Sequence, residues 1–263
     1  MTTIRNLVGV SFETMTQAFN DAFSDYNIPA NYPVEYLTGL VTRRGYRPDL
    51  AVGAFEGDRL VGFVFNCLDG DEAYNSGTGV VISHRRLGIA RQLMEHSIRT
   101  LPAKRYILEV IETNHRAAAL YRDLGFVEAR KFQCWTYITP EKTRITEIAN
   151  ANLDEIASWC DMDLSWQNRI ASIRRSREPY VVLGNEDGAA ILFTSNGDVP
   201  LLAVKRSARR KGLGSRLLGA AATRANVPLR IMNIDDRSTD IAAFLEKNGA
   251  KKTVRQLEMA FRK

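Results

Sequence analysis

Apolar residues recur at helical spacing in three parts of the first half of the chain. This spacing places the apolar side chains on one helix face, where they pack against a core. The predicted helices cover residues 12–23, 90–101 and 116–124. Ser11 is a candidate N-cap of the first helix, while Pro102 and Gly125 are expected to end the other two.

Short apolar runs alternate with these helices and predict strands. The runs cover residues 50–55, 60–68, 77–82, 106–111 and 132–138. The segment 26–48 is rich in Pro, Tyr and Asn and is expected to be a loop. Alternating strands and helices with a late hairpin predict a mixed α/β fold, in which helices cover a mixed sheet.

The second half repeats this pattern. Strands are expected at residues 180–183, 189–194, 199–204 and 229–234, and a helix at 241–247. A shift of 124 residues takes Val80 to Val204 and Gly125 to Gly249 without a gap. A repeat of this length indicates two copies of one domain. We therefore expect domains at residues 1–139 and 140–263, with a linker at 139–143.

Composition places the chain among ordinary soluble proteins. Of its 263 residues, 45% are apolar and 25% are charged. The N-terminus lacks an apolar signal core, and no apolar run approaches membrane-spanning length. The three cysteines are widely spaced and predict neither a disulfide framework nor a metal site. We expect a cytoplasmic protein with reduced thiols and no metal.

The excess positive charge lies in the second half. Residues 1–140 hold 15 basic and 15 acidic residues, whereas residues 141–263 hold 21 and 15. Five of these cations lie within residues 205–211. A polyphosphate site, a nucleic-acid patch and a solvated basic face are all compatible with such a run, nucleic acid being the least favoured.

Two arginine-led glycine loops, at residues 85–90 and 209–214, stand at the same place in each repeat. Each follows an apolar run and precedes a helix. Backbone N–H groups of such a turn, together with the helix N-terminus, form a nest for a diphosphate. A single loop of this kind is weak evidence and more often marks an ordinary helix entry. The spacing fits neither a P-loop nor a dinucleotide fingerprint.

The first loop lies in a segment that resembles a known motif. Residues 80–90, Val-Val-Ile-Ser-His-Arg-Arg-Leu-Gly-Ile-Ala, resemble the acetyl-CoA-binding motif of the GNAT superfamily of N-acetyltransferases, and residues 114–126 resemble its second motif. The resemblance covers residues 1–138 well and 146–263 more loosely. It implies two GNAT-like acyl-CoA N-acyltransferase domains, each a twisted mixed sheet flanked by helices.

The resemblance also implies which residues bind acetyl-CoA. In the first repeat they are Val80, Val81, Ile82, Arg85, Arg86, Leu87, Gly88, Ile89, Ala90, Asn114 and Tyr121. Their counterparts in the second repeat are Val204, Arg209, Gly212 and Gly214.

Glu109 is the candidate general base, since it interrupts an otherwise apolar strand. Partial burial would raise its pKa toward useful values. The alternative is a carboxylate paired with an arginine to hold the sheet, and Glu112 is the second candidate base. The Leu-Glu-Val context is similar to that of bacterial acetyltransferases that modify ribosomal-protein N-termini, in which this Glu is the base.

Tyr121 is the candidate general acid. The resemblance implies that its hydroxyl lies near the sulfur of the coenzyme, where a phenol of pKa ~10 is a reasonable proton donor. The alternative is an aromatic core residue. His84 is expected at the surface or the edge of the phosphate site. Candidates for the acceptor mouth are Asp25, Tyr26, Tyr32, Tyr46 and Tyr74.

The second repeat lacks both proton-transfer groups. The shift of 124 takes Glu109 to Asn233 and Tyr121 to Leu245, and neither side chain exchanges a proton at neutral pH. We therefore expect catalysis in the first repeat. The second copy would bind the coenzyme without reacting it, or complete the packing as the partner in an internal pseudo-dimer. A homodimer is also compatible with the sequence.

The leading hypothesis is an acetyl-CoA-dependent N-acetyltransferase that acts on a primary amine of a small molecule, peptide or protein. The second is a non-catalytic sensor or scaffold that binds CoA or an acyl-CoA. The third is association with RNA or the ribosome through the basic half. The sequence does not identify the amine.

Overall fold

The computed structural model describes residues 2–25, 31–138, 143–225 and 227–263. The chain forms two compact units. The first consists of Met1–Val110, Asn114–Ala129 and Glu258–Lys263, and the second of Ile111–Thr113 and Arg130–Leu257. The expected residue Tyr26 and most of the expected linker lie outside the described residues.

The first unit is built on a mixed sheet with the strand order β1-β2-β3-β4-β5-β11. Its strands are β1 (Thr3–Asn6), β2 (Val52–Glu56), β3 (Arg59–Asp69), β4 (Glu72–Val80), β5 (Arg105–Ile111) and the end of β11 (Lys251–Arg262). Its helices are α1 (Phe12–Ala22), α2 (Val34–Arg44), α3 (Ile89–Thr100) and α4 (His115–Asp123), with a short 3-10 turn η1 (Ile82–His84).

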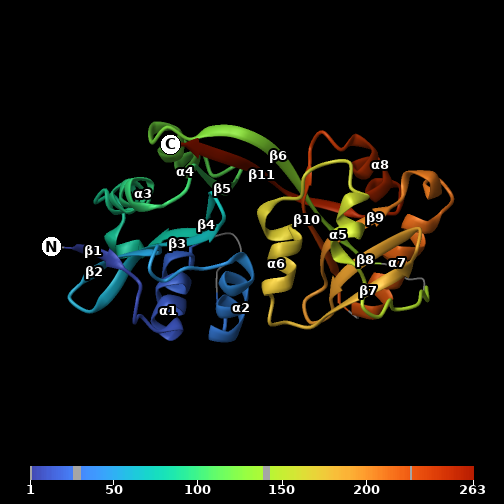
Figure 1. Ribbon diagram of the computed structural model, residues 1–263. Helices are drawn as coiled ribbons and strands as arrows, with labels where there is room; N and C mark the ends of the chain where they lie inside the picture. The colour runs from blue at the N-terminus through green and yellow to red at the C-terminus, as the bar shows by residue number, and fades with distance from the viewer. Residues whose placement is uncertain (1, 26–30, 139–142, 226) are drawn as a thin grey trace. The chain divides into compact units, whose positions relative to one another are not determined.

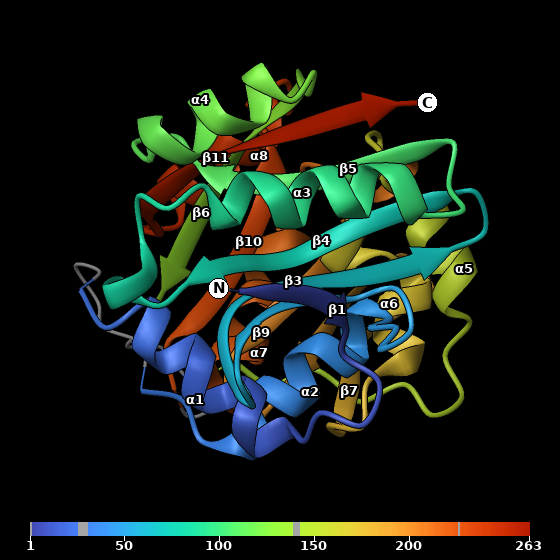
Figure 2. The ribbon, with the colours of Figure 1, turned by 90° about the vertical axis from the view of Figure 1, so that its left-hand side faces the viewer.

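Helices cover both faces of this sheet. Figure 2 shows α3 on one face and α1 and α2 on the other. Leu93 of α3 and Met15 of α1 are buried on the two sides. On the α1 side, the rings of Phe19, Phe63 and Phe65 form a cluster in which each contacts the other two, with Phe63 and Phe65 centroids 4.4 Å apart. The sheet therefore has an apolar layer on each face, as the alternating pattern predicted.

The second unit repeats the plan with the order β6-β10-β9-β8-β7 (Figure 1). Its strands are β6 (Val127–Tyr137), β7 (Tyr180–Asn185), β8 (Gly188–Phe193), β9 (Asp198–Val204), β10 (Leu229–Asp235) and the first part of β11. Its helices are α5 (Leu153–Ser158), α6 (Ile170–Arg175), α7 (Leu213–Ala225) and α8 (Thr239–Lys247), with 3-10 turns η2 (Trp166–Asn168) and η3 (Arg206–Ala208). Core residues include Trp135, Leu192 and Leu218.

The last strand of each repeat contributes to the sheet of the other repeat. Strand β6 ends the first repeat, yet from Arg130 onward it belongs to the second unit and pairs with β10. Strand β11 ends the second repeat, yet its final residues belong to the first unit, where Lys263 N–H donates to the Lys104 carbonyl at 3.1 Å. The compact units are therefore not identical to the sequence repeats.

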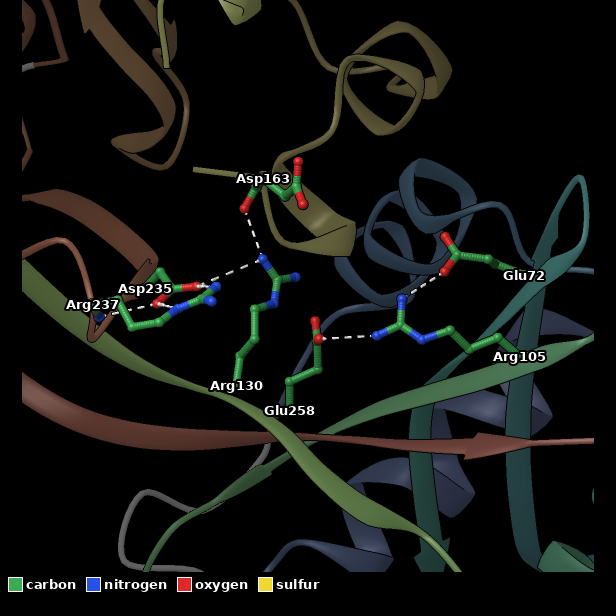
Figure 3. Close-up of polar contacts among 7 residues, drawn as sticks. All are labelled: Glu72, Arg105, Arg130, Asp163, Asp235, Arg237 and Glu258. Atoms are coloured by element: carbon green, nitrogen blue, oxygen red, sulfur yellow. Dashed lines mark hydrogen bonds and ion pairs between the residues drawn. The ribbon is translucent and has the colours of Figure 1, made fainter. Parts of the chain in front are cut away.

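Each unit contains a buried carboxylate that is paired with an arginine (Figure 3). In the first unit Glu258, which is 1% exposed, pairs with Arg105 at 3.5 Å, and Arg105 also binds Glu72 at 2.7 Å. In the second unit burial opposes ionisation of Asp235, but hydrogen bonds from Arg237 hold the pKa of this carboxyl below its usual value. Paired in this way, the buried charges avoid the cost of isolated ions.

The prediction of a loop over residues 26–48 was wrong for its second part, which contains α2. This helix contains Thr38, Gly39 and Thr42, residues of low helix propensity, so it is difficult to predict from the sequence. Strands β1 and β11 were also missed. Both are mostly exposed in their first residues, and β11 follows a basic, polar start at Lys251–Thr253.

We predict that the end of β11 stabilises the first unit. Phe261 packs on Phe126, with ring centroids 5.6 Å apart. Phe261→Ala is expected to lower the free energy of unfolding by about 2 kcal/mol, less than for a fully buried ring. Hydrogen exchange should then accelerate in β5 and α4. Val254→Ala, in the exposed part of the same strand, is the control and should cost under ~0.5 kcal/mol. If both variants accelerate hydrogen exchange in β5 equally, the stabilising role of the end of β11 is contradicted.

Candidate active site

A groove of about 480 Å³ opens in the first unit, in the range of small-ligand sites. Its walls come from the end of β4, the loop after η1, the start of α3 and the outer face of α4. The lining residues include Thr78, Gly79, Val80, Arg86, Gly88, Ile89, Ala90, Asn114, Arg116, Ala117, Leu120 and Tyr121.

The groove begins where β4 and β5 stop pairing. The two parallel strands are in register from Glu72–Arg105 to Asn75–Leu108 and no further within the described strands. At this point β4 carries one extra residue relative to β3, because Val64 pairs with Thr78 but Asn66 pairs with Asn75. Such a bulge bends the strand and raises its twist, which directs the end of β4 away from β5.

Asn75 fixes the bend. Its side chain is 5% exposed, and its Oδ1 accepts from the Gly77 N–H at 3.0 Å while its Nδ2 donates to Thr78 Oγ1 at 2.7 Å. A buried amide with both ends bonded to the same strand holds that strand in one conformation. Asn75 was not predicted as a site residue, although a glycine within a strand, here Gly77, often marks a bulge.

The loop after β4 has the conformation of an anion nest. Arg86 has φ +68° and Gly88 has φ +76°, and α3 begins directly after Gly88. A Cβ at Gly88 would meet only Gln92, at 3.7 Å, so the positive φ rather than lack of space favours glycine here. The backbone N–H groups and the helix N-terminus together favour a bound anion.

Arg85 ties the loop to α1. Its guanidinium donates to Asp25 at 2.6 and 2.9 Å, to the Ala22 carbonyl at 2.7 Å and to the Val80 carbonyl at 3.3 Å. The hydrogen bond from Arg85 holds the pKa of Asp25 below its usual value. Arg85 lines the groove, but its charge is offset, and Asp25 holds it in place.

Two other arginines at the groove keep their charge available. Arg86 on the loop and Arg116 on α4 are exposed, and neither forms an ion pair within the described residues. Arg91 is engaged with Asp123 at 3.2 Å. The mouth of the groove is thus positive, which suits a phosphorylated ligand.

Helix α4 presents one face to the groove. Asn114 caps the helix by accepting from the Ala117 N–H at 3.1 Å. Arg116, Ala117, Leu120 and Tyr121 recur at helical spacing and line the wall. Tyr121 lies at the groove, with its ring against Phe126 at 5.9 Å between centroids. The same spacing in the sequence would have identified Arg116, Ala117 and Leu120, which were missed.

Glu109 follows Leu108, the last residue of β5 that pairs with β4. It is partly buried, and its Oε2 accepts from the Tyr74 hydroxyl at 3.2 Å. It is not among the residues that line the described groove. Glu112 lies in the second unit, where it pairs with Arg255 at 3.4 Å and Lys131 at 3.9 Å.

The other predicted residues lie in varied positions. Val81 is buried, and its N–H donates to Val61, whereas Ile82 and Leu87 are exposed and, like Val81, do not line the described groove. His84 lines the groove, with Glu56 3.3 Å from its Nε2. Of the acceptor-mouth candidates, Tyr32 is 39% exposed, and Tyr46 donates to the Met15 sulfur at 3.3 Å.

The second repeat keeps the loop but changes what surrounds it. Arg210 and Gly212 repeat the positive φ values, at +64° and +82°. Arg209 repeats the bonds of Arg85, to Asp161 and to the carbonyls of Trp159 and Val204. Phe244 takes the place of Leu120 and lies against Gly214, 3.2 Å from where a Cβ would be.

In the second repeat, the positions that correspond to Tyr121 and Glu109 are occupied by side chains that do not transfer protons at neutral pH. Leu245 is 2% exposed within the core of the second unit. Asn233 adopts φ +58° at a bulge in β10, and its Oδ1 accepts from Gln256 at 2.9 Å. Among the described residues no group of three metal-ligating side chains is present, and no helix has the length and apolarity needed to cross a membrane.

Comparison with known proteins identifies the first repeat. The profile of the acetyltransferase (GNAT) family matches residues 12–126. Residues 12–126 are a GNAT-family acetyltransferase domain. No curated protein matches the sequence. The GNAT assignment supports acetyl transfer as the general chemistry of this domain.

Solved structures extend the fold to the whole chain. A putative acetyltransferase from Pyrococcus horikoshii is 18% identical, with 100% of this chain and 89% of that chain covered and a TM-score of 0.73. A GCN5-related N-acetyltransferase from Sphaerobacter thermophilus is 12% identical, covering 99% and 95%, with a TM-score of 0.72. A tandem GNAT protein from the clavulanic acid biosynthesis pathway is 15% identical, covering 100% and 98%, with a TM-score of 0.69. The fold is therefore that of tandem GNAT proteins.

We predict that Asn75 maintains the separation of the strands. Asn75→Ala leaves the Gly77 N–H and Thr78 hydroxyl without these bonds and should cost about 1–3 kcal/mol of stability. Hydrogen exchange should accelerate at residues 76–80. Asn66→Ala removes a buried amide on β3 that bonds the Leu50 carbonyl and Ser97, and it is the control. Unchanged exchange at 76–80 in Asn75→Ala would contradict the role.

Proposed function

We propose that the first repeat is an acetyl-CoA-dependent N-acetyltransferase that acts on a primary amine. The observation that carries this proposal is the groove between β4 and α4, with an anion nest at Gly88 and a phenol, Tyr121, on its wall. The GNAT assignment of residues 12–126 supports the same activity.

The residues present fit the coenzyme. The backbone around Arg86 and Gly88, with the α3 N-terminus, would hold its diphosphate, and the exposed guanidiniums of Arg86 and Arg116 would add charge. Thr78, Gly79 and Val80, on the separated end of β4, would align its pantetheine arm. Acetyl-CoA supplies the activated acetyl thioester. Arg85 serves this site by holding the loop to α1.

Proton transfer is assigned to Glu109 and Tyr121. A lysine-like amine of pKa ~10.4 costs roughly 4–5 kcal/mol to deprotonate at pH 7, so a base assists the reaction. Glu109, where β5 leaves β4, would take the amine proton directly or through water. Tyr121 would protonate the leaving thiolate. The presence of these two groups favours an enzyme over a non-catalytic CoA-binding sensor, because a sensor needs neither a general base nor a general acid.

The second repeat is assigned no acetyl transfer. Phe244 lies against its loop, and Asn233 and Leu245 replace the proton-transfer groups. A large ring where the first repeat has Leu120 reduces the space beside Gly214. The loop is kept because Arg209 and its Asp161 partner organise the fold there. We therefore propose one acetyl-CoA site in each chain.

We predict that Glu109→Gln and Tyr121→Phe each lower kcat by tenfold or more, as is typical for loss of general acid–base groups. Thiol release would be measured from acetyl-CoA with three amines: a lysine peptide, a peptide with a free α-amine and a polyamine. Matched controls are Glu112→Gln and Tyr106→Phe, which should keep near-normal rates. A large loss in Glu112→Gln with normal Glu109→Gln would move the base to Glu112.

The two repeats offer a paired test of the binding site. Alanine at a positive-φ position costs about 1 kcal/mol of strain, so Gly88→Ala and Gly212→Ala should lower stability alike. Calorimetry with CoA should give one site per chain in the wild-type protein. Gly88→Ala should weaken binding at least tenfold, and Gly212→Ala should not. Two equivalent sites per chain, or loss in both variants, would refute the assignment to the first repeat.

A further inference from the structure

We propose that Tyr74 is a positioning residue of this enzyme, and that its hydroxyl orients the Glu109 carboxylate toward the acceptor amine. This inference depends on the proposed function and extends it to a residue outside the groove. Its basis is the hydrogen bond from Tyr74 Oη to Glu109 Oε2, at 3.2 Å.

The backbone fixes both partners. Tyr74 pairs with Ile107, and Glu109 lies two residues beyond Ile107 on β5, so both side chains point to the same face of the sheet. Tyr74 is 2% exposed, so its ring has little freedom. The bond spans the last pair of the two strands, Asn75 and Leu108, from Tyr74 before it to Glu109 after it. A carboxylate held here is fixed at the start of the opening rather than free to rotate.

Helix α2 contacts the same region of β4. Its last residue, Arg44, donates to the Ser76 carbonyl at 3.1 Å and to Ser76 Oγ at 3.2 Å. Ser76 is the residue after Asn75 and lies within the bulge. Tyr74 therefore lies between a bulge that α2 contacts and the part of β4 that pairs with β5, which restricts the position of its ring.

The phenol remains a donor at every pH of interest. Burial, followed by the negative charge of Glu109, raises the pKa of Tyr74 well above its usual value. The other charged or titratable groups acting on this phenol are the Arg44 guanidinium of α2 and the Cys67 thiol of β3. A hydrogen bond donated to a carboxylate favours its ionised form. The contact thus keeps Glu109 both oriented and ready to accept a proton.

The second repeat lost both members of this pair. The shift of 124 residues takes Tyr74 to Asp198 and Glu109 to Asn233, both of them buried. The carboxylate of Asp198 thus stands in place of the phenol, and the amide of Asn233 stands in place of the carboxylate. If Tyr74 served only to fill the core, its replacement would not need to accompany that of the base, and an apolar residue would serve.

The test is the pH dependence of kcat in Tyr74→Phe, measured by thiol release with the panel amine that turns over fastest. Loss of the Tyr74 donor disfavours the ionised carboxylate, so the pKa of Glu109 rises. The acid limb of the pH profile of kcat, where the rate falls as Glu109 is protonated, then moves to higher pH. A hydrogen bond to a charged group predicts a shift of about one pH unit. We expect kcat at pH 7 to fall about threefold or more, with KM for acetyl-CoA unchanged.

Tyr106→Phe is the matched control. Tyr106 is also a buried phenol, and it donates to Asn66 Oδ1 at 2.5 Å. Its variant should lose similar stability without moving the acid limb. In a Glu109→Gln background, Tyr74→Phe should have no further effect on kcat, because the group it orients is absent. An unmoved limb, or an equal loss in that background, would overturn the proposal.

Two further outcomes separate the failures. If the wild-type protein transfers no acetyl group to any panel amine, the proposed function fails. If Glu109→Gln is slow but Tyr74→Phe is normal, only the positioning role fails. Should Tyr74→Phe not fold, 3-fluorotyrosine at position 74 keeps the volume and donates a stronger hydrogen bond. It should move the acid limb to lower pH, and an unmoved limb overturns the role.

Discussion

The site of the first unit depends on one constraint, the end of pairing between β4 and β5 after Asn75 and Leu108. Up to that point a parallel ladder satisfies both strands. Beyond it, β4 needs other partners, and the Asn75 side chain supplies them by bonding the Gly77 N–H and the Thr78 hydroxyl. The separation provides space for the groove, directs β4 into the positive-φ loop at Arg86 and Gly88, and leaves Glu109 at the point of divergence. The same bulge recurs in β9, where Ile191 pairs with Leu201 but Phe193 pairs with Asp198, so the bulge belongs to the fold and the Asn75 amide holds it in this unit.

The repeat shows which features belong to the scaffold and which to the chemistry. The bonds of Arg85 to a carboxylate, a helix-end carbonyl and a strand carbonyl recur at Arg209, and the positive φ values of both loops agree within about ten degrees. These features are needed to fold the strand-to-helix turn, whether or not a ligand binds. Tyr74, Glu109 and Tyr121 have no equivalents of the same chemistry in the second repeat. A residue kept in both units thus serves the turn itself, whatever else it does, whereas one replaced in the second unit is a candidate for the chemistry of the first.

How much the sequence predicts follows from the same distinction. Residues near in sequence and governed by local rules were predictable: Gly88 at a helix start and Tyr121 on a helical face. The arginine at position 85 was expected at the phosphate, and the motif alone did not reveal that Asp25, sixty residues earlier, neutralises it. Helix α2 was missed because it contains several residues of low helix propensity, such as Gly39. The hydrogen bond between Tyr74 and Glu109 depends on the register of two strands 35 residues apart in sequence, which no local pattern encodes. The exchange of β6 and β11 is of the same kind, since either pairing satisfies the same alternation of side chains.

The basic run at residues 205–211 can be reconsidered on this basis. Asp161 binds both Arg206 and Arg209, and those hydrogen bonds lower the pKa of its carboxyl, while Lys205 pairs with Glu155 at 3.7 Å and lies over the Trp159 ring. Three of the five cations are therefore engaged within their own unit, and they join the turn after β9 to the helix α5 region. The net charge of the second half overstates the positive charge available to a polyanion. A cation run read from sequence counts charges, whereas a ligand responds only to those that the fold has not already neutralised.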